Sequence, residues 1–183
     1  MRKSTVSLII LIVSILGLAA CSTTNDASHM GMQNDEYDGN AVMFAQMMIP
    51  HHEQAVQLSK LALKNSTNAE VLDLAARIKK AQSPEIIQMQ GWLEAVGMPD
   101  MNHVMEMPGY VDDSHFSKIK KLTGKDFDLL FLKLMIGHHE GAIEMASDIK
   151  NNKNDEVKAL SVAITTSQSA EISEMEGLLE KLS

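Results

Sequence analysis

Hydrophobic and polar residues alternate with the period of an α-helix through most of the chain after residue 38. Apolar residues and a few polar ones recur every three or four positions, whereas the two-residue alternation typical of half-buried strands is absent. Four such stripes can be read: Phe44, Met48, His52, Ala55, Ser59 and Ala62; Val71, Leu74, Ile78, Gln82, Glu85 and Met89; Phe131, Met135, His139, Ala142 and Ala146; Val157, Leu160, Ile164, Gln168, Glu171 and Met175. The pattern predicts four long helices.

These four segments form two copies of one unit. The residues 44–53 reappear as 131–140, so that His51 corresponds to His138 with an offset of 138 − 51 = 87. The residues 82–89 reappear as 168–175, with an offset of 168 − 82 = 86. Self-similarity across a unit of two elements indicates an internal duplication, here of a helical hairpin. Hairpins with short links predict an all-α fold, an antiparallel four-helix bundle made of two duplicated hairpins.

Turn and capping signals place the ends of the helices. Polar residues at 65–68 and 151–154 predict the hairpin turns, and Thr123 followed by Asp126 resembles a capping signal. Pro84 should kink the second helix or restart it with Ser83 as its cap. The segment 97–121 contains Pro99, Pro108 and Gly109 and is predicted to be the long central crossover between the hairpins.

The first twenty residues have the pattern of an export signal. Arg2 and Lys3 precede an apolar run from Val6 to Ala20 that is too short for a membrane span. The run ends in a lipobox-like Leu-Ala-Ala-Cys, which predicts lipidation of Cys21; a simple secreted signal is the alternative. We therefore expect a signal peptide at 1–20, a flexible polar tether at 21–38 and a helical domain at 39–183. The acyl chains would anchor the protein to a membrane.

Charge and cysteine usage exclude several kinds of site. Without Arg2 and Lys3 the net charge of −8 becomes −8 − 2 = −10, and so acidic a surface disfavours nucleic acid as a partner. Cys21 is the sole cysteine. Once it is acylated, the domain can form neither disulfides nor thiolate metal sites. The expected location is the periplasmic side of the cell envelope, at the outer membrane if the host is Gram-negative.

Methionine and histidine are paired in both copies of the unit. The chain has fourteen methionines. Residues four apart share a helix face, so Met47 lies beside His51, Met48 beside His52 and Met135 beside His139. The duplication adds His138 to the second cluster. Thioethers favour Cu(I) and imidazole accepts it, so the pattern predicts a site for copper, preferably Cu(I), or for Ag(I).

The competing interpretation makes the methionines core residues and the histidines hydrogen-bonded polar residues. Burying four imidazoles without partners would cost several kcal/mol, about 1–3 for each, so their duplication favours metal binding. Glu53 and Glu140 could orient the imidazoles, although a solvated position is favoured for both. Other polar residues on apolar stripes could bond to the histidine rings: Gln82, Glu85, Gln168 and Glu171.

The central crossover holds a second methionine cluster. Its members crowd a stretch of ten residues: Met98, Met101, His103, Met105 and Met107. Methionines in a loop have little core to fill, which favours capture of a soft metal. A lid packed over the helices explains them equally well.

The repeated motif resembles the signature of domain of unknown function 305 (DUF305). The resemblance is carried by Phe-x-x-Met-Met-Ile-Pro-His-His-x-x-Ala at 44–55 and Phe-x-x-x-Met-Ile-Gly-His-His-x-x-Ala at 131–142, and it covers about residues 38–182. It implies a ferritin-like bundle, and members similar to periplasmic copper-binding proteins bind monovalent copper or silver through methionine and histidine. The resemblance implies these metal ligands: Met47, Met48, His51, His52, Met135, His138 and His139, with Met89 and Met175 as supports.

The two copies differ at two positions of the motif. Family members often have an acidic residue three positions before the motif phenylalanine, where the second copy has Asp128 and the first has Ala41. Met47 is matched by Leu134 in the second copy. The two clusters are therefore expected to differ in affinity or in ligand number.

Three classes of function compete for such a sequence. We favour a binding protein that sequesters or relays copper outside the cytoplasm, with a metal-delivery protein as partner; the sequence does not define the oligomeric state. A di-iron enzyme would need Glu-x-x-His pairs, but Met48 and Met135 stand three positions before His51 and His138. A zinc protease would need His-Glu-x-x-His, which is absent. A structural envelope protein without metal is the third class.

Overall fold

The computed structural model describes residues 36–99 and 107–183. The predicted signal peptide, Cys21 and nearly all of the predicted tether lie outside these residues, as do Met101, His103 and Met105. The described part of the chain forms five helices and no strands, which confirms the all-α prediction. None of these helices combines the length and the apolar character that crossing a membrane requires.

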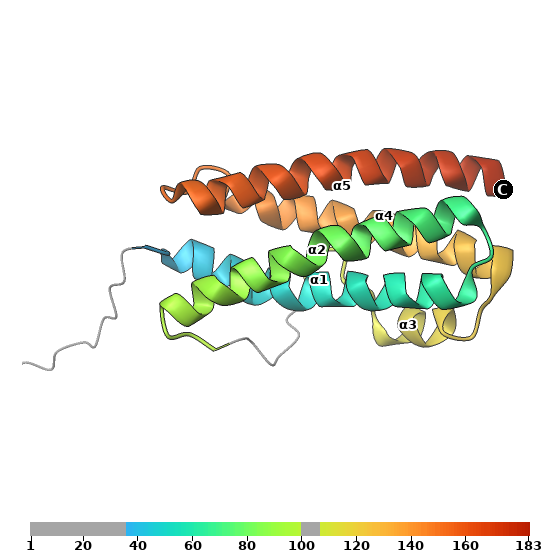
Figure 1. Cartoon of the computed structure of the whole chain (residues 1–183), viewed down its shortest axis with the longest axis horizontal. Coiled ribbons are helices and arrows are strands. Elements are labelled where there is room, and N and C mark those ends of the chain that lie inside the picture. The colour runs from blue at the N-terminus through green and yellow to red at the C-terminus, as the bar shows by residue number, and fades with distance from the viewer. Residues whose placement is uncertain (1–35, 100–106) are drawn as a thin grey trace, which may run out of the picture. The chain divides into compact units, whose positions relative to one another are not determined.

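Four long helices form two hairpins. α1 (Gly39–Asn65) packs along α2 (Ala69–Ala95), and α4 (Gly124–Asp148) packs along α5 (Asp155–Leu182). The four long helices run along the length of the domain (Figure 1). The hairpins meet mainly along α1 and α4, while α2 and α5 touch less. Apart from Glu85, which is half-buried, every residue of the four predicted stripes is buried, so the helical period did identify the inner faces.

Both hairpin turns end in the same cap. Asn68 accepts hydrogen bonds from the backbone N–H groups of Glu70 and Val71 at 2.9 and 3.4 Å, and Asn154 does the same for Glu156 and Val157 at 2.8 and 3.4 Å. Such caps satisfy N–H groups that the first helical turn leaves unpaired. The predicted turns are therefore confirmed. Thr123 is the N-cap of α4 but its side chain makes no capping hydrogen bond, so that detail of the prediction was wrong.

α2 does not restart at Pro84. The helix is continuous from Ala69 to Ala95, and the Ser83 hydroxyl donates to the Lys79 carbonyl at 2.7 Å instead of capping a new helix. Proline removes one helical hydrogen bond. The buried residues Gln82 and Met89 lie on either side of Pro84, and α2 packs along α1, so tertiary packing supports the helix across the proline.

The crossover contains a short helix that the sequence pattern did not predict. α3 (Asp113–Ile119) begins after Asp112, whose carboxylate accepts from the N–H groups of Ser114 and His115, both at 2.9 Å. Ile119 is its one buried residue. Seven residues with a single buried position give no helical period to detect, which is why the segment read as a loop.

Residues 107–111, which we call the strap, cross α1 and α4. Gln54 of α1 holds the strap by two hydrogen bonds: its Nε2 donates to the Val111 carbonyl at 2.8 Å, and the Val111 N–H donates to its Oε1 at 2.7 Å. On α4, a Cβ added at Gly141 would lie only 2.0 Å from the Pro108 carbonyl oxygen. Glycine is therefore required where the strap touches α4.

Tyr37 shows that the folded domain begins before residue 39. Its side chain is 9% exposed, and its ring stacks on that of Trp92 with 5.4 Å between centroids. Its hydroxyl donates to Glu156 at 2.9 Å. The predicted tether boundary at residue 38 therefore left out a residue that joins the start of α1 to α2 and α5.

Tyr37→Phe is expected to lower the free energy of unfolding by about 1 kcal/mol, because it removes one hydrogen bond to a charged group. Tyr37→Ala should cost about 3 kcal/mol, because it also removes the ring from Trp92. Urea denaturation of the two variants measures both. Equal stability of Tyr37→Ala and the unmodified protein would show that Tyr37 belongs to the tether.

Candidate metal centre

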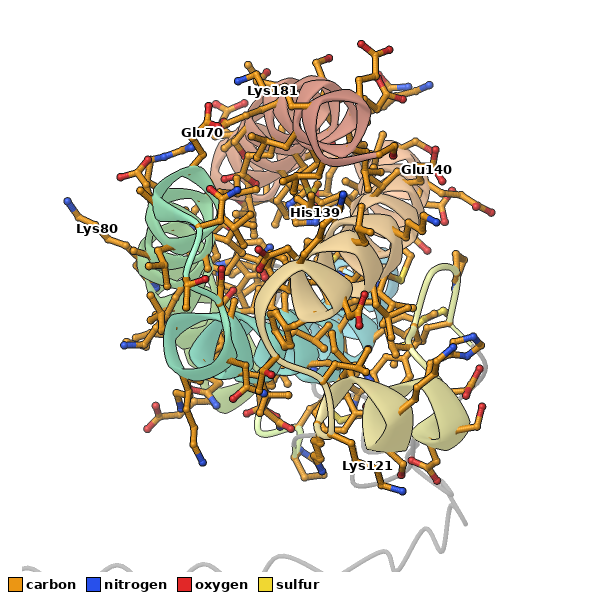
Figure 2. All side chains as sticks on the ribbon, turned by 90° about the vertical axis from the view of Figure 1, so that its right-hand side faces the viewer. Glu70, Lys80, Lys121, His139, Glu140 and Lys181 are labelled. Carbon is orange, nitrogen blue, oxygen red and sulfur yellow. The ribbon has the colours of Figure 1, made fainter. Side chains whose placement is uncertain are left out.

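The four histidines of the duplicated motif lie fully inside the domain. His51, His52, His138 and His139 each have 0% exposure. An end-on view shows His139 between the helices, while Glu140 next to it points outward (Figure 2). Glu53 is exposed like Glu140, as the sequence favoured for both, so the acidic residues of the motif do not orient the imidazoles.

His51 of α1 and His138 of α4 stack on each other across the interface between the hairpins. Their ring centroids are 3.7 Å apart and their planes are inclined by 36°. The Nε2 of His51 lies 3.0 Å from the Pro108 carbonyl, so this nitrogen is the N–H donor and the strap fixes the ring. Neither nitrogen of His138 has a hydrogen-bond partner in the described part of the chain.

Burial keeps this pair uncharged. It lowers the pKa of His51 from 6.5 to about 3, with a further contribution from the neighbouring His52. It also lowers the pKa of His138 well below 6.5, and His51 adds to the effect. At neutral pH both rings therefore present a lone pair instead of a positive charge, which is the form that ligates a metal.

His52 and His139 form a second, symmetric arrangement with carboxylates from the partner helices. Their Nε2 atoms each lie 2.8 Å from a carboxylate oxygen, of Glu85 on α2 and of Glu171 on α5. The predicted support from these two glutamates is confirmed. A carboxylate that accepts the Nε2 proton fixes the tautomer and leaves Nδ1 as the free lone pair, the arrangement common behind metal-bound histidine.

The two glutamines predicted to bond to the histidines do not do so. Gln82 and Gln168 are buried at 2% exposure, yet their amides have no hydrogen-bond partner among the described residues. The sequence placed both side chains on the inner face correctly. A stripe position defines the face of a residue but not the rotamer of a long side chain, so the bonds could not be predicted.

The structure places the predicted thioethers in three kinds of environment. Met48 and Met89 are fully buried in one hydrophobic cluster, and Met135 and Met175 are fully buried in another. Met47 is half-buried, as is Leu134 at the equivalent position. In the crossover, Met107 is buried at 7% exposure like a lid residue, whereas Met98 is 45% exposed.

The donor atoms suit a soft metal and disfavour a hard one. Five buried ring nitrogens lack a partner in the described part of the chain: His51 Nδ1, His52 Nδ1, His139 Nδ1 and both nitrogens of His138. Within residues 36–99 and 107–183, no group of three His, Cys, Asp or Glu side chains is arranged to hold a metal ion. Buried thioethers accompany these imidazoles on the same helices, and thioether with imidazole is a ligand set that favours Cu(I).

Sequence reasoning missed the direct stacking of His51 on His138. The duplication put equivalent histidines on equivalent helices, but which of the two pairs would meet depends on how the hairpins pack. It also missed the carbonyl of Pro108 as a partner of His51. No signal in the sequence links residues 51 and 108.

Comparison with known proteins agrees with this architecture. The sequence model of the domain of unknown function DUF305 matches residues 41–179. The chain belongs to this family. Among curated proteins, none matches the chain.

Solved DUF305 structures have the same fold. One, from Streptomyces coelicolor and classed as a secreted protein, is 30% identical with a TM-score of 0.74, over 78% of this chain and 93% of its own. A DUF305 fragment from Deinococcus radiodurans is 30% identical with a TM-score of 0.74, over 79% of this chain and 98% of the fragment. CopM in the Cu(I)-bound form is 30% identical with a TM-score of 0.67, over 77% of this chain and 96% of the CopM chain. CopM has also been solved in Cu(II)-bound and silver-bound forms.

Proposed function

We propose that this DUF305 protein binds Cu(I), and also Ag(I), and that it sequesters or relays the ion outside the cytoplasm and so contributes to copper tolerance. One observation carries the proposal: four fully buried, duplicated imidazoles keep ring nitrogens without partners inside a methionine-rich interior. Leaving such groups unsatisfied costs about 1–3 kcal/mol each, and a bound cation would offset that cost. The copper-bound and silver-bound forms of CopM support the choice of ion.

The residues divide into ligands and supports. The ligand candidates are Met47, Met48, His51 and His52 in the first hairpin and Met135, His138 and His139 in the second, with Met89 and Met175 as supporting thioethers. Glu85 and Glu171 hold two of the imidazoles in one tautomer. Bound copper would be cargo, and the residues would serve to desolvate it and to exclude competing hard ions.

The proposed setting is a lipid-anchored, ferritin-like four-helix bundle in the cell envelope. The secreted relative from Streptomyces coelicolor supports export. The two hairpins joined by the crossover support the bundle. Lipidation of Cys21, sorting to an outer membrane and a metal-delivery partner belong to the same proposal.

We further propose that the protein is not an enzyme. A di-iron site would use several carboxylates and histidines around the metal. Among the described residues, the buried histidines have two carboxylate partners, Glu85 and Glu171, and each bonds a different ring. Asp128 is also buried, but within the described ranges no hydrogen bond joins it to a histidine, and buried thioethers stand on the same helices as the imidazoles, which suits storage of a soft ion.

Anaerobic titration of the full chain in detergent with Cu(I), against a competing chelator, tests the proposal. Met48→Leu with Met135→Leu conserves volume and should leave the fold intact at a cost below about 1.5 kcal/mol for each substitution. We expect this variant to bind Cu(I) at least tenfold more weakly, and the pair His51→Leu and His138→Leu about a hundredfold, equivalent to about 2.7 kcal/mol. His115→Ala, at an exposed histidine, is the matched control.

The outcomes separate the candidate sites. Cu(I) should also raise the melting temperature of the unmodified protein, because an ion that binds only the folded state stabilises it. Unchanged affinity in both double variants would refute the helical histidine site and leave methionines outside it, such as the crossover cluster Met98–Met107, as the site of binding. Absence of Cu(I) binding in the unmodified protein would favour the structural interpretation.

A further inference from the structure

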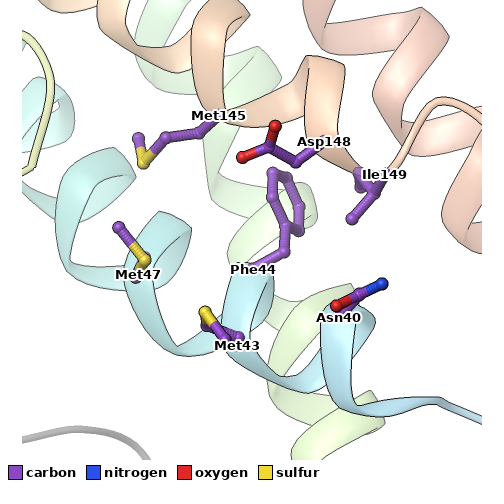
Figure 3. Close-up of a pocket in the computed structure, with 7 residues that line it drawn as sticks. All are labelled: Asn40, Met43, Phe44, Met47, Met145, Asp148 and Ile149. Atoms are coloured by element: carbon purple, nitrogen blue, oxygen red, sulfur yellow. The ribbon is translucent and has the colours of Figure 1, made fainter.

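A pocket of about 330 Å³ opens between the start of α1 and the end of α4. Three of its lining residues are methionines, Met43 and Met47 from α1 and Met145 from α4 (Figure 3). The remaining lining residues are Asn40, Phe44, Asp148 and Ile149. Met43 and Met145 belong to neither copy of the duplicated motif.

The thioethers converge from two helices. Met43 and Met47 are four residues apart and therefore share one face of α1. Met145 faces them from α4, and Figure 3 shows the thioethers of Met47 and Met145 on the same side of the pocket. Exposure falls from 56% at Met43, through half-buried Met47, to 6% at Met145. The three sulfur-bearing side chains thus lead from solvent into the domain.

The composition of the pocket suits a soft cation. An exposed methionine forgoes the roughly 1.5–3 kcal/mol that burial of its side chain would contribute. A single exposed apolar residue needs no explanation, but here it completes a set of three thioethers. Asp148 adds a negative charge on the pocket wall (Figure 3). Thioether donors with one carboxylate match a monovalent soft ion such as Cu(I) or Ag(I).

The pocket is separate from the histidine pair but on the same helices. Met47 lies one turn before His51, and Met43 lies two turns before it, about 12 Å along α1 at 1.5 Å per residue. α4 is paired with α1 at His51 and His138, and Met145 follows His138 by two turns. The pocket and the buried pair are therefore successive positions along one helical interface.

We propose that Met43, Met47 and Met145 form a solvent-accessible site for a monovalent soft cation. This assigns Met47, one of the ligand candidates named above, to the pocket and leaves the buried histidine site to the other candidates. The inference rests on the proposed function only in taking the same class of ion. An occupied pocket would give the protein a point of first contact with the ion at its surface, next to the interior donors. A purely apolar partner segment is the competing occupant.

Titration of the full chain in detergent with Ag(I), followed by NMR of 13C-labelled methionine methyl groups, tests this site. Substitution of each methionine in turn assigns the signals. We expect the methyl signals of Met43, Met47 and Met145 to shift together, and Met43→Leu with Met145→Leu to weaken that binding event at least tenfold. Ile149→Val is the matched control, because it changes an apolar wall of the pocket and keeps every thioether.

The test of the pocket does not depend on whether the buried histidine site binds the ion. In the variant with His51→Leu and His138→Leu, the three pocket signals should still shift. Shifts confined to other methionines would overturn the pocket site while leaving the proposed function in place. Pocket shifts without any shift of the Met48 and Met135 methyl signals would support the pocket and refute the buried site. Equal effects of Ile149→Val and the methionine double variant would indicate an apolar occupant and overturn the proposal.

Discussion

Lowering the pH from 7 to 5 is expected to destabilise the metal-free domain by about 2 kcal/mol through His51 alone, because its pKa falls from 6.5 to about 3 on folding. His138 acts in the same direction, since burial also holds its pKa well below 6.5. Between these pKa values the unfolded chain binds a proton at each of the two histidines and the folded chain does not. Stability is therefore full above pH 6.5 and is lost as the pH falls below it.

Urea denaturation at pH 7, 6 and 5 measures the effect. Below pH 6.5 the slope should approach about 1.4 kcal/mol per pH unit for each of the two histidines, His51 and His138. Carboxylates with lowered pKa values, such as Glu156, contribute below pH 4.5 and do not overlap with this window.

Two variants separate the buried pair from other histidines. His51→Leu with His138→Leu should flatten the pH dependence, whereas His115→Gln, at an exposed histidine of α3 that pairs with Asp112, should keep the larger part that the buried pair contributes. If the leucine variant does not fold, NMR titration of the imidazole rings in the unmodified protein serves instead. Equal stability at pH 7 and pH 5, or ring titration near pH 6.5 in the folded state, would contradict the assignment.

The acid effect also bears on metal release. A proton and a metal ion compete for the same imidazole lone pair, so metal affinity should fall with pH as well. In the folded state this competition begins at a lower pH, because burial disfavours the protonated ring. Burial therefore keeps the rings of His51 and His138 available as ligands at a pH where a histidine with an ordinary pKa would already be protonated.

Periodicity made the helices and their inner faces predictable. The stripe through Phe44, Met48 and His52 lies inside the domain as expected, and so does its copy through Phe131, Met135 and His139. The duplication supplied independent evidence for each hairpin. The bonds from Glu85 and Glu171 to the histidines followed from polar residues standing on apolar stripes.

Features that depend on how separate segments pack could not be predicted. The stacking of His51 on His138 requires the relative position of two hairpins. The pocket methionines Met43 and Met145 are 102 residues apart (145 − 43 = 102) and follow no shared motif. Tyr37 reads as tether because its partners, Trp92 and Glu156, lie far along the chain. In each case the decisive contact is long-range and leaves no periodic signal.

The second large effect on folding stability is expected where the strap contacts α4, because only a glycine leaves room for the strap there. Gly141→Ala would place a Cβ 2.0 Å from the Pro108 carbonyl oxygen and 2.7 Å from the Gly109 nitrogen. Both are backbone atoms, and the strap cannot shift freely, since Gln54 bonds Val111 twice and His51 bonds Pro108. We expect the variant to lose about 3 kcal/mol of folding free energy by overpacking.

Gly177→Ala is the matched control for this substitution. Gly177 is also helical, in α5, and a Cβ there meets nothing within 4 Å. Alanine should stabilise that position by roughly 0.5–1 kcal/mol, because glycine in a helix interior is unfavourable. The same chemical change is thus expected to act with opposite signs at two helical glycines, and urea denaturation of both variants measures the difference.

Hydrogen exchange shows whether the loss at Gly141 is local to the strap. Displacement of Pro108 would remove the hydrogen bond that fixes His51 and loosen the strap, so the Val111 amide should exchange faster in Gly141→Ala than in Gly177→Ala. The pKa of His51 should then rise toward 6.5 as water reaches the ring. A Gly141→Ala variant with unchanged stability and unchanged Val111 exchange would mean that the strap does not rest on α4 in solution, and the buried character of the His51–His138 pair would lose its structural basis.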